Sequence, residues 1–252
     1  MKNLPFGSRL FLLIDLSLLF LGLSNIPSVF NRATIPFHAD LTDERVVVLR
    51  IADQSASGGL RVGDKVTQWT DQTVEVPEVL EFFSDLSSIG DHVSIEYERE
   101  NVRSRTSIVL IPYYESPRFV LTMVFVGVIT WAIGILVLVH QRNDPAAGIL
   151  HWSLILMAAT VLLTQGAMQA DEVLTFFNRG LLYATYTLLA AVLLLFTTVF
   201  PKPKFGALPK KAILILSPMI FLATVQIWFF LKAVQANSAE VFGFFQRSFD
   251  AF

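Results

Sequence analysis

The sequence predicts an α-helical polytopic membrane protein with about five transmembrane helices and one α+β domain between the first two of them. Two observations on composition predict this fold class. The 252-residue chain is 54% hydrophobic and only 16% charged, whereas soluble domains are about 25% charged. Long apolar segments recur, each near the ~20 residues needed to cross ~30 Å of hydrocarbon. A third observation is that one polar stretch, from Arg45 to Pro112, interrupts these segments.

The predicted spans divide the chain into four regions. They run over residues 10–30, 119–139, 146–165, 181–200 and 212–231. The first follows Lys2 and Arg9 as a secretory signal would, but Asp15 interrupts it and no small-residue cleavage site follows. We therefore expect it to be retained. The expected regions are an anchor (1–33), the polar domain (34–116), a four-helix bundle (117–234) and an amphipathic tail (235–252).

Lysine and arginine in the short loops predict the orientation. Residues 201–211 contain four lysines, the N-terminus carries Lys2 and Arg9, and the 140–145 loop carries Arg142. With five spans these three segments share one side, which we expect to be cytoplasmic. The polar domain then faces outward, and we expect the chain to lie in a bacterial inner (cytoplasmic) membrane with its N-terminus inside.

Within the polar domain, the residue pattern predicts four strands and one helix. β-branched or alternating runs indicate strands at residues 46–51, 66–69, 93–97 and 107–111. Between the second and third strands, apolar residues recur at helical spacing from Val79 to Leu86. Pro77 suits the first turn of that helix. The predicted order is strand, strand, helix, strand, strand.

Residues 55–74 resemble the centre of a bacterial, permuted PDZ domain. That family has an Ala-Gly-Leu motif, then Gly-Asp, then a turn such as Asn-Gly. Here Gly58-Gly59-Leu60 stands for the first motif, Gly63-Asp64 for the second and Asp71-Gln72 for the turn. We expect Gly63 to have a positive φ, Leu60 to be buried and Asp64 to accept hydrogen bonds from turn amides.

The resemblance implies that the domain binds extended peptides beside a ligand strand and a helix. It places the partner-contacting residues at Val46, Val47 and Val48 of the strand and at Val79, Phe82 and Phe83 of the helix. The family's carboxylate-binding loop would fall within residues 32–44, which contain no glycine. Two interpretations therefore stay open: a peptide-binding groove, or a rigid docking face.

The sequence argues against catalytic and nucleic-acid functions. It contains neither Gly-x-Ser-x-Gly nor His-Glu-x-x-His, so we expect no enzymatic activity. The net charge of −2 leaves no basic stripe for nucleic acid. His140 and His151 flank the hairpin between the second and third spans, where we favour packing roles over cofactor ligation. We expect no metal and no cofactor.

Asp15 is the intramembrane polar residue to which we give most weight. Ionisable groups inside a span are costly and usually face a partner. We expect it to hydrogen-bond between helices, with Gln165, Gln226 or a hydroxyl group as its partner. Small residues, including Gly127 and Gly134 of the second span, predict close helix packing.

Two functions remain open from the sequence. An anchor, an outward PDZ-like domain and a helical bundle resemble the N-terminal input region of PDZ-containing bacterial sensor histidine kinases. The first function is therefore a non-catalytic sensory or regulatory input module whose partners are other membrane or extracytoplasmic proteins and peptides. The alternative is an accessory subunit that clamps a larger membrane complex.

Overall fold

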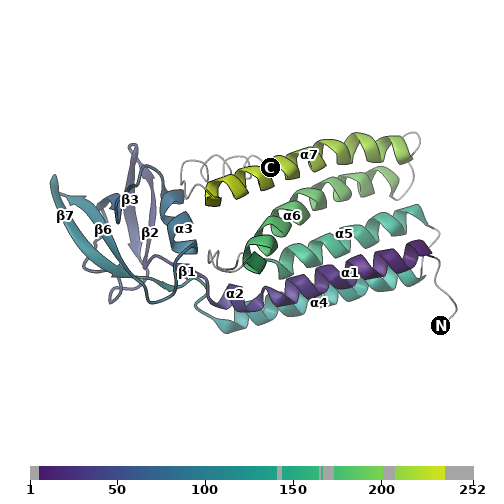
Figure 1. Ribbon diagram of the computed structural model, residues 1–252, viewed down its shortest axis with the longest axis horizontal. Helices are drawn as coiled ribbons and strands as arrows, with labels where there is room; N and C mark the ends of the chain where they lie inside the picture. The colour runs from purple at the N-terminus through teal and green to yellow at the C-terminus, as the bar shows by residue number, and fades with distance from the viewer. Residues whose placement is uncertain (1–5, 141–143, 165, 167–172, 201–207, 236–252) are drawn as a thin grey trace. The chain divides into compact units, whose positions relative to one another are not determined.

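A computed structural model describes residues 6–140, 144–164, 166, 173–200 and 208–235 of the chain (Figure 1). The chain divides into two compact units. Residues 30–115 form most of one of them, and we call these residues the sheet domain. The long helices form most of the other, which we call the membrane unit. All of the predicted tail after Gln235 lies outside the described residues.

Among the described residues, five segments are long and apolar enough to cross a membrane, which is compatible with a multi-pass membrane protein. These spans are Leu10–Phe30, Pro117–His140, Pro145–Leu162, Phe177–Val199 and Ala212–Lys232. The helices that contain them are α1 (Phe6–Ser24) with the short α2 (Ile26–Phe30), α4 (Pro117–His140), α5 (Pro145–Leu162), α6 (Val173–Val199) and α7 (Leu208–Gln235). Their number and positions confirm the prediction.

Helices α1, α4 and α5 pack closely against one another (Figure 1). A Cβ atom added at Gly22 of α1 would lie 2.6 Å from Cβ of Leu162 on α5, and one at Gly127 of α4 would lie 2.6 Å from Cγ of the same leucine. A Cβ atom at Gly134 would lie 3.0 Å from Ile155 of α5. The predicted close packing at Gly127 and Gly134 is confirmed, because the missing side chains make room for α5.

The sheet domain is built on an antiparallel sheet with the strand order β2-β3-β4-β6-β7. These strands are β2 (Phe37–Thr42), β3 (Arg45–Ile51), β4 (Lys65–Trp69), β6 (His92–Arg99) and β7 (Val102–Val109). The short β5 (Gln72–Thr73) pairs with β4, and β1 (Ala33–Thr34) pairs with β8 (Ile111–Pro112). Helix α3 (Pro77–Asp85) packs against β1 and β2.

The predicted helix and four strands are present, but the prediction did not include β2. Its residues 37–42 do alternate between apolar and polar side chains, as in a half-buried strand, but the resemblance assigns residues 32–44 to a loop. Only Phe37 of this strand is buried. Its hairpin with β3 turns at Asp43 and Glu44, which have φ values of 51° and 60°. Two-residue hairpin turns are usually recognised in a sequence by Asn-Gly or Asp-Gly. The last predicted strand, β7, starts earlier than predicted, at Val102. Its first residues are mostly exposed, so the apolar pattern did not indicate them.

One predicted turn is displaced by one residue. The turn assigned to Asp71-Gln72 is formed by Thr70 and Asp71, and Gln72 already pairs with Trp69 as the first residue of β5. Thr70, the first of the two turn residues, has a positive φ of 53°, which lies in the region that favours glycine. The register of β4 with β5 places the turn one residue earlier than the sequence predicted.

Replacing Gly22 by alanine tests the packing of α1 on α5. We expect Gly22→Ala to lower the stability of the membrane unit by about 1–3 kcal/mol, because the new methyl group overlaps Cβ of Leu162. Gly148→Ala is the matched control, since nothing lies within 4 Å of a Cβ atom there. Thermal unfolding in detergent measures both. An equal response of the two variants contradicts this packing.

Candidate functional site

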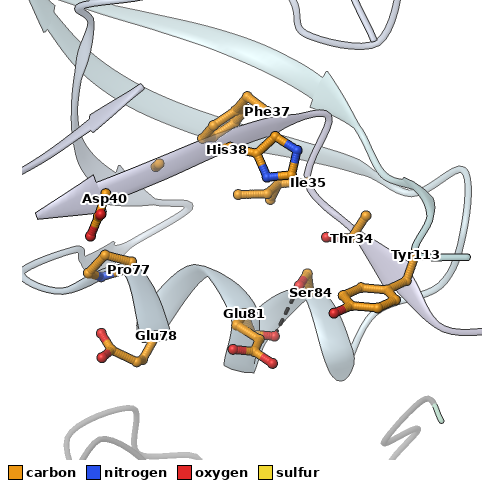
Figure 2. Close-up of a pocket in the computed structure, with 11 residues that line it drawn as sticks. Thr34, Ile35, Phe37, His38, Asp40, Pro77, Glu78, Glu81, Ser84 and Tyr113 are labelled. Atoms are coloured by element: carbon orange, nitrogen blue, oxygen red, sulfur yellow. Dashed lines mark hydrogen bonds between the residues drawn. The ribbon is translucent and has the colours of Figure 1, made fainter. Parts of the chain in front are cut away.

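A cavity of about 370 Å³ lies between strand β2 and helix α3 of the sheet domain (Figure 2). Side chains from β2 line one wall and side chains from α3 line the other. Asp40, Pro77 and Glu78 lie at one end, and Thr34, Ser84 and Tyr113 at the other. The remaining lining residues are Ile35, Phe37, His38, Ala39 and Glu81.

Strand β2 borders this cavity with an unpaired edge. Among the described residues, it pairs with β3 on one side only, and it ends the strand order of the sheet. An edge strand presents main-chain N–H and C=O groups that another extended chain can pair with. A register shift between His38 and Ala39 interrupts its pairing with β3, and such bulges re-aim side chains. The cavity thus combines a main-chain edge with a helical wall.

A buried arginine fixes helix α3 beside this strand edge. Arg32 has only 1% of its surface exposed, and its Nε donates to Oδ1 of Asp85 at 2.6 Å. Its Nη2 donates to Oδ2 of Asp85 at 3.2 Å and to Oε1 of Glu81 at 2.9 Å. The guanidinium carbon lies 3.8 Å from the centre of the Tyr113 ring. Arg32 therefore links the segment before β1, the helix and the segment after β8.

The ionisation of Arg32 is secured by these partners. Burial by itself lowers the pKa of Arg32, but the charge of Asp85, its hydrogen bonds and the charge of Glu81 outweigh that effect. The net pKa of Arg32 is therefore raised above its ordinary value. Because a buried cation is tolerated only when paired, the interaction is sensitive to loss of either carboxylate.

The cavity lining is acidic. Asp40, Glu78 and Glu81 line it, and none of the described lining residues is lysine or arginine. Oε2 of Glu78 is shielded from solvent and has no hydrogen-bond partner among the described residues. Oδ1 of Asp40 accepts a hydrogen bond from the N–H of Leu41 at 2.7 Å. Glu81 is half-buried and shares Arg32 with Asp85.

The structure places the six predicted partner-contacting residues mainly in the domain interior. Val46 and Val48 of β3 are at most 1% exposed, Val47 is half-buried, and β3 is an inner strand between β2 and β4. Val79, Phe82 and Phe83 of α3 are also buried. The strand beside the cavity is β2, and the helix faces the cavity with Pro77, Glu78, Glu81 and Ser84 instead. The apolar residues therefore marked the face of each element that packs into the core, and not the face that lines the cavity.

The Gly-Asp motif organises the loop between β3 and β4. Gly59 and Gly63 have φ values of 85° and 93°, and Leu60 is fully buried, as the sequence predicted for Gly63 and Leu60. Oδ2 of Asp64 accepts the N–H of Arg61 at 2.7 Å, which confirms the expected bond to a turn amide. The sequence did not reveal that Arg99 of β6 also binds Asp64, with Nε–Oδ1 and Nη2–Oδ2 distances of 2.7 and 2.6 Å.

Asp15 faces His151, which was not among its predicted partners. Both side chains have no exposed surface, and Oδ1 of Asp15 lies 3.5 Å from Nε2 of His151 on α5. Of the predicted partners, Gln226 instead accepts a hydrogen bond from Thr187 at 2.7 Å, and Gln165 lies outside the described residues. The partnership links residues 136 positions apart, so sequence spacing gave no indication of it.

The ring of His151 contacts two helices. Nδ1 of His151 lies 2.9 Å from the carbonyl oxygen of Gly134 on α4, and Nε2 faces Asp15 of α1. Nε2 and both carboxylate oxygens of Asp15 have no hydrogen-bond partner among the described residues. His151 therefore lies where α1, α4 and α5 meet.

The remaining histidine of the α4–α5 hairpin is not brought into this pair. His140 is exposed, and its Nδ1 lies 2.9 Å from the carbonyl oxygen of Leu136 in its own helix. Within the described ranges, no three His, Cys, Asp or Glu side chains are grouped so that they could hold a metal ion. The expected packing role of His151 therefore includes an electrostatic contact between α1 and α5.

Two comparisons with known proteins identified no family for this chain. A scan against protein-family models gave no match. A search of curated proteins also gave no match.

The Asp64–Arg99 pair predicts a pH dependence of the sheet domain. Burial raises the pKa of Asp64, but its bonds to Arg99 and Arg61 outweigh this and lower the pKa overall. Its stabilising effect is therefore full above the unfolded-state pKa of ~3.9 and is lost as pH falls through the lower folded-state pKa. We expect Asp64→Asn to cost about 2 kcal/mol at pH 7 and far less at pH 2.

Hydrogen exchange of amides in β3, β4 and β6 measures this difference in the intact chain. The exposed Asp71→Asn is the matched control, because it removes the same charge from a turn. A difference between Asp64→Asn and the unaltered protein that is equally large at both pH values contradicts the pairing.

The Asp15–His151 contact predicts energetic coupling between α1 and α5. Asp15→Leu and His151→Leu should each destabilise the membrane unit, because each leaves a buried polar partner unpaired. The double variant should lose less than the two single losses added together, with a coupling of about 1–2 kcal/mol. Unfolding in detergent gives all three values. Ser17→Ala, on an exposed part of α1, is the control. Strict additivity would exclude the contact.

Proposed function

We propose that the sheet domain is a PDZ-like module for binding polypeptides, and that the chain is a non-catalytic membrane protein that uses it as a sensory or regulatory input. The observation that supports this most directly is the unpaired edge of β2 facing α3 across the cavity. PDZ domains receive an extended peptide as an added strand between such an edge and such a helix. The cavity therefore has the form that this mode of binding requires.

The neighbouring elements support the same assignment. The Gly-Asp loop joins two strands of the sheet, and α3 follows the second of them, in the order that the resemblance implies. In this assignment β2 takes the place of the ligand strand, one strand outward from the valines of β3. Its six residues span about 20 Å, enough for a short peptide segment.

The segment before β2 argues against obligatory capture of a C-terminus. In PDZ domains, main-chain amides of the loop before the ligand strand hold the terminal carboxylate. Here that position is occupied by Thr34, Ile35 and Pro36, of which proline has no N–H to donate. An internal segment of a partner protein therefore fits the groove as well as a chain end does.

The chain connections offer a route from the groove to the spans. Strand β1 begins at Ala33, three residues after the first span ends at Phe30, and β8 ends at Pro112, five residues before α4 begins. The two strands pair with each other, with Ala33 opposite Pro112. A ligand beside Thr34 and Tyr113 would act on both connections. It would change the packing of the spans only by binding two arrangements with different affinity.

The proposed location is a bacterial inner membrane with the sheet domain outside the cytoplasm. The four lysines of residues 201–211 support this, together with Lys2, Arg9 and Arg142, since five spans place these segments on one side. The natural partners in this arrangement are other membrane or extracytoplasmic proteins.

Filling the groove provides the test of this function. Ala39 lines the cavity, so Ala39→Tyr should block it, whereas Val102→Tyr adds the same group to the opposite edge strand, at an exposed site. The full chain in lipid nanodiscs is offered a random library of seven-residue peptides, blocked at both ends. We expect the unaltered chain and Val102→Tyr to enrich peptides, and Ala39→Tyr to lose at least tenfold of that binding.

Two results would count against the proposal. Enrichment that Ala39→Tyr leaves unchanged would place binding elsewhere. Absence of enrichment, combined with a stoichiometric protein partner that copurifies equally with Ala39→Tyr, would favour the alternative of an accessory subunit.

A further inference from the structure

The lining of the groove carries an excess of negative charge. Three carboxylates, those of Asp40, Glu78 and Glu81, line the cavity, and the described lining contains no lysine or arginine. The nearby Arg32 is already bound to Asp85 and Glu81 and is 1% exposed. Its single positive charge is shared with Asp85, which does not line the cavity. The groove therefore retains a net negative charge that an incoming group can neutralise.

Glu78 shows where this charge lacks a partner. Its Oε2 atom is shielded from solvent without a hydrogen-bond partner among the described residues. A carboxylate in the first turn of a helix is favoured by the helix dipole, and that accounts for the presence of an acid at this position. It does not account for a shielded oxygen without a donor, which is unfavourable in a folded protein. A donor supplied by a ligand would remove this deficit.

Asp40 lies at the same end of the cavity as Glu78, and Figure 2 draws the ring of Pro77 between them. One carboxylate belongs to the strand wall and the other to the helix wall. Some side chains of a peptide lying along β2 would point toward this end of the cavity, since successive side chains of an added strand alternate between its two faces. A long cationic side chain reaches such a position with its charged end while its methylene groups cover apolar surface.

We propose that the groove selects a polypeptide segment with a lysine or arginine whose cationic group binds at the end of the cavity where Asp40 and Glu78 lie. This inference rests on the proposed function, because it names the class of peptide that the same groove receives. The remaining lining suits the rest of such a segment: Ile35, Phe37 and Ala39 offer apolar contacts. A peptide with acidic residues at this point would meet repulsion from three carboxylates.

The test uses the full chain in nanodiscs and the random seven-residue library with both ends blocked, so that no terminal charge contributes. The bound peptides are sequenced. We expect at least threefold enrichment of lysine plus arginine at one position. The best peptide is then compared with an analogue carrying norleucine for lysine, or citrulline for arginine. The analogue should bind about tenfold more weakly, and added salt should reduce the difference.

Variants assign the effect to the two carboxylates. Glu78→Gln and Asp40→Asn should each reduce the preference for the charged peptide over its neutral analogue, whereas Asp71→Asn, an equal change of charge in an exposed turn, should retain it. Glu78→Lys should shift the enrichment toward aspartate and glutamate. A new preference of this kind cannot arise from a protein that has failed to fold.

The outcomes separate this inference from the function on which it rests. If no peptide is enriched by the unaltered chain, the proposed function fails and this inference fails with it. If peptides bind and Ala39→Tyr blocks them, but basic residues are not enriched, the groove stands and only the charge selection is overturned. Basic enrichment that survives both Glu78→Gln and Asp40→Asn also overturns it.

Discussion

The candidate site depends on one buried interaction, the pairing of Arg32 with Asp85 and Glu81. Its guanidinium joins the segment that enters the sheet domain, the last turns of α3 and the Tyr113 ring on the segment that leaves it. A buried ion pair is weak evidence for stability, because desolvation offsets much of the attraction. Its geometric effect is clearer, since two hydrogen bonds to one carboxylate hold the helix at a defined distance from β1. That distance sets the width of the cavity beside β2.

In the membrane unit, too, a buried polar contact joins helices, here within apolar packing. Helices α1, α4 and α5 approach closely where Gly22 and Gly127 leave room for Leu162. The buried approach of Asp15 to His151 adds a polar contact between α1 and α5 to this packing. The indole N–H of Trp131 donates to the carbonyl oxygen of Asp15 at 3.0 Å and adds a third helix to that contact. Polar contacts thus specify which of several apolar packings the unit adopts.

Much of the fold could be predicted from the sequence, because lipid imposes a length and a polarity on each span. The strands with a buried face and helix α3 were also visible, as were the buried Leu60 and the positive φ of Gly63. Strand β2 was missed although its residues alternate between apolar and polar, because the resemblance assigned residues 32–44 to a loop and the turn after the strand contains no glycine. The partner-contacting residues that the resemblance indicates stay a prediction, and most of them lie in the core. Apolar residues such as Val46 and Phe82 mark the core, while polar residues such as Glu78 line the groove.

Pairs distant in sequence were beyond any local pattern. Asp15 with His151, Arg32 with Asp85 and Asp64 with Arg99 are each set by tertiary contact. Binding of a peptide between β2 and α3 is tested most directly by amide hydrogen exchange of the full chain in nanodiscs, with and without a saturating peptide. A peptide bound along β2 should slow exchange in residues 34–42 and 77–85 and leave exchange in β7 unchanged. Protection of β7 instead, or of no part of the sheet domain, would contradict it.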